Sequence, residues 1–103
     1  MTSVTGLYPS DNWSGRVVAY RRSECAGGSV HVDLLGDPSL FHTPQTVTAN
    51  GTTRVVFPGV RTGLTVPLRN CAARFVVSPT KVPGGLDRRR LGIRFLTFAY
   101  THP

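Results

Sequence analysis

The chain consists of short runs in which apolar and polar residues alternate, and glycine, proline and asparagine separate the runs. In one run Val30, Val32 and Leu34 share one parity, and Gly36-Asp37-Pro38 ends the run. A two-residue period is typical of β-strands, and no stretch between the runs has the 3.6-residue period of an amphipathic helix. The expected strands lie within residues 13–21, 30–35, 40–49, 53–57, 63–68, 71–77 and 85–100. We therefore predict an all-β fold, an antiparallel β-sandwich of jelly-roll or immunoglobulin-like type with about seven to eight strands.

The final run is expected to be apolar on both faces towards its end. Leu91, Ile93 and Phe95 share one parity, whereas Leu96 and Phe98 share the other, so a regular strand would be apolar on both faces. Such strands usually lie in the middle of a sheet, and we expect that position here. The phenylalanines expected in the core are Phe57, Phe75 and Phe95.

Turn residues place other boundaries. Asn50-Gly51 is a strong hairpin signal and should connect the runs on either side of it. Pro44 lies inside the run 40–49, and because proline has no N–H for a strand ladder, we expect this run at a sheet edge or a bulge. Residues 1–12 are expected to form a loop or a short edge strand.

A length of 103 residues, with 40% hydrophobic and 17% charged, fits a single β-sandwich domain spanning residues 1–103. No apolar run approaches the roughly 20 residues of a membrane span. The first residues do not read as a signal peptide. We expect the chain to be a fragment of a longer membrane or exported protein.

The two cysteines, Cys25 and Cys71, are too few and too far apart in sequence for a metal site. Each lies at the end of an expected strand, so a disulfide is the better interpretation. The closed loop would stabilise the fold by ~4 kcal/mol in the chain-entropy model. A disulfide also indicates an oxidising, extracytoplasmic location, in the cell envelope or outside the cell.

The sequence offers little for catalysis. His31 alternates with Val30 and Val32, His42 lies in another run, and His102 is near the end of the chain. None of them has the local spacing of a metal site or a catalytic triad. We therefore predict no enzymatic activity, no metal and no cofactor.

A formal net charge of +7 results from 12 lysines and arginines, all but one of them arginine, against 5 acidic residues. This balance favours polyanionic partners, among them acidic polysaccharides, anionic lipid headgroups and nucleic acids. A GC-rich coding sequence, which produces arginine in preference to lysine, is the alternative explanation of this composition.

The segment from Tyr8 to Arg22 is the expected carbohydrate site. An exposed Trp13 or Tyr8 would present an aromatic plane to the apolar C–H face of a sugar ring, and nearby polar side chains would bind its hydroxyl groups. The predicted carbohydrate-binding residues are Trp13, Tyr8, Asp11, Asn12 and Arg22, with Asp87 and Arg88 as a secondary group. Burial of Trp13 in the core is the alternative.

Several short motifs follow one another in a recognisable order. They include Gly6-Leu7-Tyr8, Trp13-Ser14, Gly36-Asp37-Pro38-Ser39-Leu40-Phe41, Pro44-Gln45-Thr46-Val47, Thr65-Val66-Pro67-Leu68 and Asp87-Arg88-Arg89-Arg90-Leu91-Gly92. In this order the chain resembles the extracytoplasmic β-sandwich at the C-terminal end of some bacterial membrane glycosyltransferases of the GT-C type and, more loosely, jelly-roll carbohydrate-binding modules. The resemblance implies a non-catalytic module, accessory to a glycosyltransferase, that binds cell-envelope or extracellular polysaccharide. Its implied partners are a polysaccharide or glycan and the membrane-embedded transferase domain of the same polypeptide.

Two other functions stay open. Six arginines would bind a polyanion if they gathered on one face, although we do not expect a nucleic-acid partner. They are Arg16, Arg21, Arg22, Arg88, Arg89 and Arg90. The other alternative is a structural or protein-interaction sandwich without a ligand, which an apolar patch lacking a polar groove would indicate.

Overall fold

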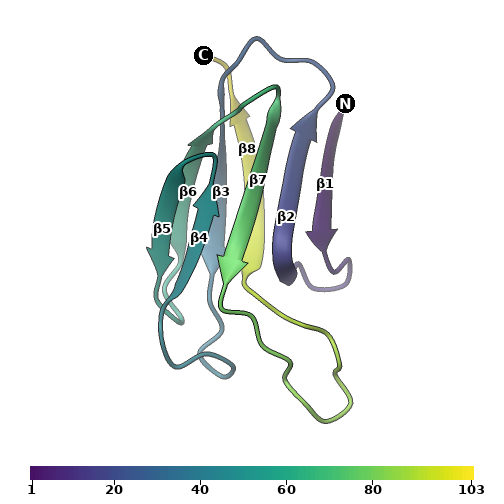
Figure 1. The fold of residues 1–103 in the computed structure, drawn as a ribbon, viewed down its shortest axis with the longest axis vertical. Coiled ribbons are helices and arrows are strands. Elements are labelled where there is room, and N and C mark those ends of the chain that lie inside the picture. Colours follow the sequence, from purple (N-terminus) through teal and green to yellow (C-terminus); the bar gives the residue numbers. More distant parts are fainter.

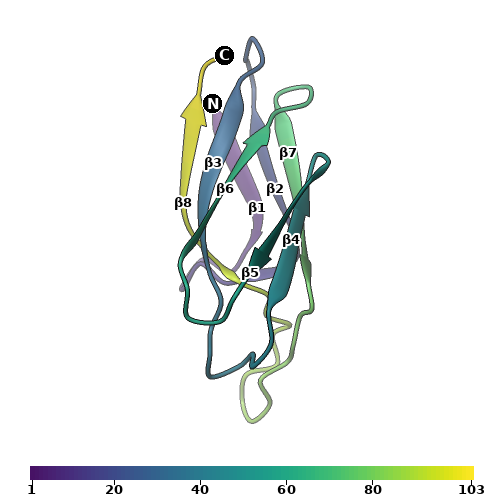
Figure 2. The same cartoon turned by 90° about the vertical axis from the view of Figure 1, so that its left-hand side faces the viewer.

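The structure is a computed structural model that describes residues 1–103, and it contains eight β-strands. They are β1 (Thr2–Leu7), β2 (Ser14–Arg22), β3 (Ser29–Leu35), β4 (Gln45–Ala49), β5 (Thr52–Val56), β6 (Thr62–Pro67), β7 (Ala72–Ser78) and β8 (Arg94–Thr101). One antiparallel sheet has the order β1-β2-β7-β4-β5, and the other has the order β6-β3-β8. Figures 1 and 2 show the two sheets facing each other, with both chain ends at the same end of the molecule. The predicted antiparallel sandwich is confirmed. No helical segment has the length and hydrophobicity that crossing a bilayer requires.

The core lies between the two sheets, where alternate residues of each strand point inward. Val30, Val32 and Leu34 of β3 are fully buried, as their shared parity predicts. They belong to one cluster with Phe75 of β7 and Phe95 of β8, whose rings pack edge to face with centroids 5.4 Å apart. The core positions predicted for Phe75 and Phe95 are therefore confirmed.

The core position predicted for Phe57 is wrong, because 56% of this residue is exposed. β5 ends at Val56, which is the last inward-facing residue of that strand and is fully buried. Phe57 has the opposite parity and follows the strand end, so its ring points away from the core.

β8 lies at a sheet edge beside β3, so the prediction of a central position is wrong. Phe95 pairs with Leu34, and Thr97 pairs with Asp33, which leaves Leu96 as an extra residue in a β-bulge. An extra residue reverses the parity of everything after it. Phe95 therefore points inward before the bulge and Phe98 points inward after it. The bulge, not burial on two faces, explains why both parities are apolar.

The hairpin at Asn50-Gly51 is confirmed: φ is 46° at Asn50 and 84° at Gly51, and the turn joins β4 to β5. The run 40–49 is shorter than predicted, because residues before Gln45 form turns and β4 begins only after Pro44. The proline lies outside the ladder, and β4 occupies an internal position between β7 and β5, so the prediction of a sheet edge or a bulge is wrong. Residues 2–7 form β1, the expected edge strand.

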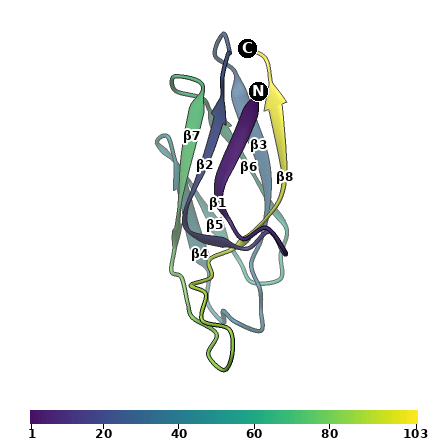
Figure 3. The same cartoon turned by 90° about the vertical axis from the view of Figure 1, so that its right-hand side faces the viewer.

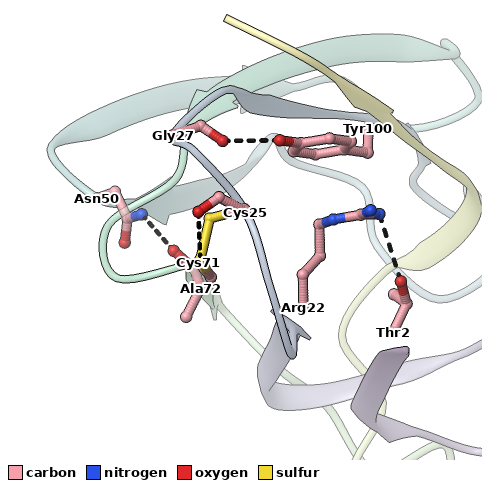
Figure 4. Close-up of a disulfide and its surroundings, with 8 residues drawn as sticks. All are labelled: Thr2, Arg22, Cys25, Gly27, Asn50, Cys71, Ala72 and Tyr100. Atoms are coloured by element: carbon pink, nitrogen blue, oxygen red, sulfur yellow. Dashed lines mark hydrogen bonds between the residues drawn. A yellow bond between two sulfur atoms is a disulfide. The ribbon is translucent and has the colours of Figure 1, made fainter.

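The predicted disulfide between Cys25 and Cys71 is present, with 5.7 Å between the two Cα atoms. It connects the β2–β3 loop to the tight β6–β7 turn (Figure 4). The turn is held from the other side by Asn50, whose amide donates hydrogen bonds to the carbonyls of Pro67 and Ala72. This end of the sandwich is therefore fastened both covalently and by polar contacts, in the form expected of an oxidising compartment.

Candidate functional site

Trp13 lies in a small second core together with Phe41 and Leu91. Only 4% of it is exposed, and the guanidinium of Arg94 lies 4.9 Å from the centre of the indole. The backbone of Trp13 also forms an isolated antiparallel bridge with Arg94, the first residue of β8. The predicted role of Trp13 as an exposed stacking surface is therefore wrong, and the alternative of core burial is confirmed.

Three of the predicted residues, Tyr8, Asp11 and Asp87, lie around one side chain, because each of them contacts Arg89. Arg89 Nη1 donates to Asp11 Oδ2 at 2.9 Å, and its Nη2 donates to Asp87 Oδ2 at 2.9 Å. The same guanidinium lies 5.0 Å from the centre of the Tyr8 ring. Arg89 was expected only among the arginines for polyanion binding and not at the carbohydrate site, because its partner Asp11 is 78 positions away in the sequence.

The charges of this network are already paired, since Arg89 binds both Asp11 and Asp87. Hydrogen bonds donated by the Arg89 side chain and backbone lower the pKa of Asp87, and the two carboxylates raise the pKa of Arg89 further above its ordinary value. A guanidinium shared by two carboxylates and stacked on a tyrosine has few groups left for a ligand. We assign Tyr8, Asp11, Asp87 and Arg89 to structural bracing.

The remaining predicted residues are dispersed. Asn12 is exposed in the turn before Trp13, with φ at 59°, and Arg88 is exposed next to the Arg89 network. Arg22 is at the far end of β2, where its guanidinium lies 3.8 Å from the centre of the Tyr100 ring and donates to Thr2 (Figure 4). The structure therefore does not bring Arg22 together with the others.

The arginines proposed for polyanion binding do not form one patch either. Arg21 and Arg22 end β2 at the disulfide end of the sandwich, whereas residues 88–90 lie between β7 and β8 at the opposite end (Figure 1). The molecule extends 45 Å along this axis, so the two groups cannot contact one short ligand.

A groove of about 550 Å³ lies where the edge strands of the two sheets meet, β5 of one and β6 of the other. These strands lie side by side on the left in Figure 1 and face the viewer in Figure 2. The groove is lined by Thr53, Arg54, Val55, Phe57, Val60, Arg61, Thr62 and Gly63. Its apolar side chains are open to solvent, with Phe57 56%, Val60 54% and Val55 47% exposed. An aromatic ring and two arginines therefore line one concave surface.

Asp33 on the outer face of β3 fixes Arg61 at the groove. Arg61 Nη2 donates to Asp33 Oδ2 at 3.1 Å, and Thr97 Oγ1 donates to the same oxygen at 2.9 Å. The hydrogen bonds from Thr97 and Arg61 lower the pKa of Asp33. Asp33 is thus ionised at neutral pH, and Arg61 makes one side-chain hydrogen bond, to Asp33, so its other N–H groups have no protein acceptor.

His31 joins Asp33 to Thr65 across the β3–β6 pairing. His31 Nδ1 lies 2.8 Å from Thr65 Oγ1, and its Nε2 lies 3.3 Å from Asp33 Oδ1. Register places Thr65 opposite His31, which no local spacing in the sequence reveals. A hydroxyl, an imidazole and a carboxylate in series resemble the order of a hydrolase triad. Here Asp33 already accepts from Arg61 and Thr97, and we assign the series to orienting Arg61. The prediction of no enzymatic activity stays a prediction.

Comparisons with protein-family models, with curated proteins and with solved structures find no match to this chain. The resemblance to the transferase-linked sandwich therefore stays a prediction.

The groove was not predicted from the sequence, because Phe57 was expected in the core. One signal was available: Phe57 is followed by Pro58-Gly59, so the strand ends at the aromatic residue, and Arg54 and Arg61 lie within four residues of it on either side.

Proposed function

We propose that the chain is a non-catalytic carbohydrate-binding module that binds an acidic polysaccharide in the β5–β6 groove. The observation that supports this proposal is the presence of an exposed aromatic ring, Phe57, in one groove with Arg54 and Arg61. We further propose that the module acts outside the cytoplasm, next to a membrane glycosyltransferase, where the disulfide is stable.

Each part of the groove suits a different part of a uronic-acid chain. The Phe57 ring packs against the C–H face of a sugar ring, and Val55 and Val60 extend that apolar surface. Arg54 and Arg61 bind carboxylates, which the planar guanidinium contacts through two parallel hydrogen bonds. Thr53 and Thr62 supply hydroxyl groups for the remaining sugar oxygens. The net charge of +7 increases the encounter rate with such a chain.

Affinity at a single site should be weak, because an open groove buries little area and sugar hydroxyls lose hydrogen bonds to water on binding. We expect uronic-acid oligosaccharides to bind with lower Kd than neutral oligosaccharides of equal length. Titration calorimetry and amide chemical-shift mapping measure both the affinity and the location.

Matched variants locate the site. Phe57→Ala should weaken binding about tenfold through lost apolar contact, and Arg61→Ala should weaken the acidic ligand more than the neutral one. Arg74→Ala, on the exposed outer face of β7, is the control for general charge. Tyr8→Ala is the control for the N-terminal site predicted from the sequence. Unchanged affinity in a folded Phe57→Ala protein contradicts the proposal, and a loss confined to Tyr8→Ala moves the site to the N-terminal segment.

Two measurements distinguish this carbohydrate-binding function from the alternative of nucleic-acid binding. Single-stranded oligonucleotides at low salt should bind less tightly than uronic-acid chains, and affinity for the sugar should survive in part at high salt, since stacking does not depend on counterions. Tighter binding of the oligonucleotide, with a steep salt dependence, would replace carbohydrate with nucleic acid as the ligand.

A further inference from the structure

A finger of the chain, residues 79–92, projects beyond the sheets between β7 and β8. Figures 1 and 3 show it at the end of the molecule opposite the two termini. The finger belongs neither to the sheet ladders nor to the β5–β6 groove. Its sequence combines apolar, glycine and basic residues, so its role has to come from what it presents to the outside.

The base of the finger is fixed by a buried amide. Gln45 is 1% exposed, and its Nε2 donates to the carbonyl of Pro79 at 3.1 Å and to the carbonyl of Gly92 at 2.8 Å. Next along the finger, Lys81 and Leu91 exchange both backbone hydrogen bonds at 2.8 Å. The two arms are therefore held together like a short hairpin.

The tip is shaped by two glycines and braced from the side. Gly84 and Gly85 have φ of 93° and 62°, which is the left-handed conformation that reverses the chain there. Arg89 connects the returning arm to Asp11 in the N-terminal segment at 2.9 Å. A loop that is clamped at its base and braced along one arm presents its tip in a fixed position.

What the tip presents is apolar. Leu86 is exposed at 103% and Val82 at 42%, and neither packs on either core cluster. Leu86 and Val82 are therefore apolar side chains at the tip of a braced loop that no other part of the fold covers.

The two arms of the finger carry three exposed cations, which we call the collar. Lys81, Arg88 and Arg90 are exposed, whereas Arg89 is neutralised by Asp87 and Asp11. Lys81 Nζ donates to Leu40 O in the β3–β4 loop at 3.2 Å, and Arg90 Nη1 donates to Thr80 Oγ1 at 3.2 Å, so both side chains are held near the base of the finger. Long basic side chains beside an apolar tip are the pattern of interfacial membrane contact, because the tip enters the headgroup region while the cations remain at the anionic surface.

We infer that the finger docks the sandwich onto an anionic lipid bilayer, with Leu86 and Val82 entering the headgroup region and Lys81, Arg88 and Arg90 binding lipid phosphates and acidic headgroups. Charge complementarity selects this occupant. A protein partner would need several hundred Å² of shaped surface per side, whereas two side chains at a turn suit a fluid interface. This inference is independent of carbohydrate binding in the groove.

Vesicle sedimentation tests the inference with the full chain. Vesicles of phosphatidylcholine containing about a third phosphatidylserine should bind the protein, whereas pure phosphatidylcholine vesicles should bind it at least tenfold more weakly, since each basic residue near an anionic surface contributes about fivefold. Leu86→Ser should weaken binding about tenfold, and Arg88→Gln with Arg90→Gln about thirtyfold. Val4→Ser, at an exposed apolar site on β1, and Arg74→Gln, at an exposed site on β7, are the matched controls and should bind as the parent does.

A second variant reports insertion directly. Leu86→Trp should show a blue-shifted and intensified tryptophan emission when phosphatidylserine vesicles are added, above the constant signal of the buried Trp13. Absence of binding to acidic vesicles overturns the inference. Equal binding of Leu86→Ser and parent, or no emission change at Leu86→Trp, overturns it as well, because the contact would then be charge alone. Preferential binding of an oligonucleotide over acidic vesicles assigns the collar to nucleic acid instead.

Discussion

The two ends of the sandwich are held together by different chemistry. At the end with the termini, a disulfide joins Cys25 in the β2–β3 loop to Cys71 in the β6–β7 turn. At the finger end the connections are an amide clamp at Gln45 and the ion pairs of Arg89. A disulfide is indifferent to acid and salt but sensitive to reductant, whereas ion pairs respond in the opposite way. The two ends should therefore fail under different conditions.

Breaking the disulfide should have the largest effect. Replacing Cys25 and Cys71 with serine removes a cross-link between residues 46 positions apart, and the free energy of unfolding should fall by ~4 kcal/mol. Urea unfolding measures the loss, and the serine variant should be unaffected by reductant. A loss below ~1 kcal/mol would show that polar contacts alone hold this end.

Removing the clamp at the finger end should have the next largest effect. Gln45→Leu keeps the side-chain size but deletes both hydrogen bonds, leaving the carbonyls of Pro79 and Gly92 without a donor. Because Oε1 of the same amide is buried without a partner, part of the loss is offset, and we expect about 2 kcal/mol. Thr48→Ala, at an exposed position of the same strand, is the control. An equal effect of the two substitutions contradicts the clamp.

Acid should loosen the finger end before the disulfide end. Hydrogen bonds from Ser39 lower the pKa of Asp37, and those from Arg89 lower the pKa of Asp87, each from an ordinary value of 3.8. A carboxyl group with a lowered folded pKa stabilises the fold above its unfolded pKa, and this contribution is lost as the pH falls through the folded value. Stability should thus be flat from pH 7 to 5 and fall below pH 4, with Asp37→Asn reducing the fall by under ~1 kcal/mol. A loss that begins above pH 5 would implicate other groups.

Loosening the brace alone should have the smallest effect. Arg89→Lys keeps the charge but cannot bond Asp11 and Asp87 together in the same planar geometry. We expect unchanged global unfolding and faster amide exchange confined to residues 84–90, measured by mass spectrometry. A global loss as large as that of Gln45→Leu would mean that the brace is part of the core.

Features set by short-range chemistry could be predicted from the sequence. Asparagine and glycine tolerate the positive φ that a two-residue hairpin turn requires, and Asn50 and Gly51 adopt it. Which of residues 30–34 face the core follows from the two-residue period of that strand alone. The disulfide followed from the fact that the chain has only two cysteines. These predictions did not require knowledge of which strands are neighbours.

Features set by distant neighbours could not be predicted. Whether Trp13 or Phe57 is buried depends on which segments cover them. Trp13, for which both exposure and burial were open, is 4% exposed, and Phe57, which was expected in the core, is 56% exposed. The pairing of His31 with Thr65 and of Arg89 with Asp11 depends on register and on loop closure, which alternation along one strand does not encode. The predicted carbohydrate residues were consequently divided between a brace, a core and a distant strand end.

The bulge at Leu96 also bears on the tendency of this protein to aggregate at high concentration. Open strand edges invite pairing with another molecule and hence aggregation, which irregular backbone or charge prevents. β8 is interrupted at Leu96, and β1 is interrupted at Gly6, where the pairing with β2 shifts register. The other two edges, β5 and β6, are regular, but β5 carries Arg54 and Arg61 directly precedes β6, so a second copy would bring like charges together. Every open edge is therefore protected against fibril-like growth, two by geometry and two by charge.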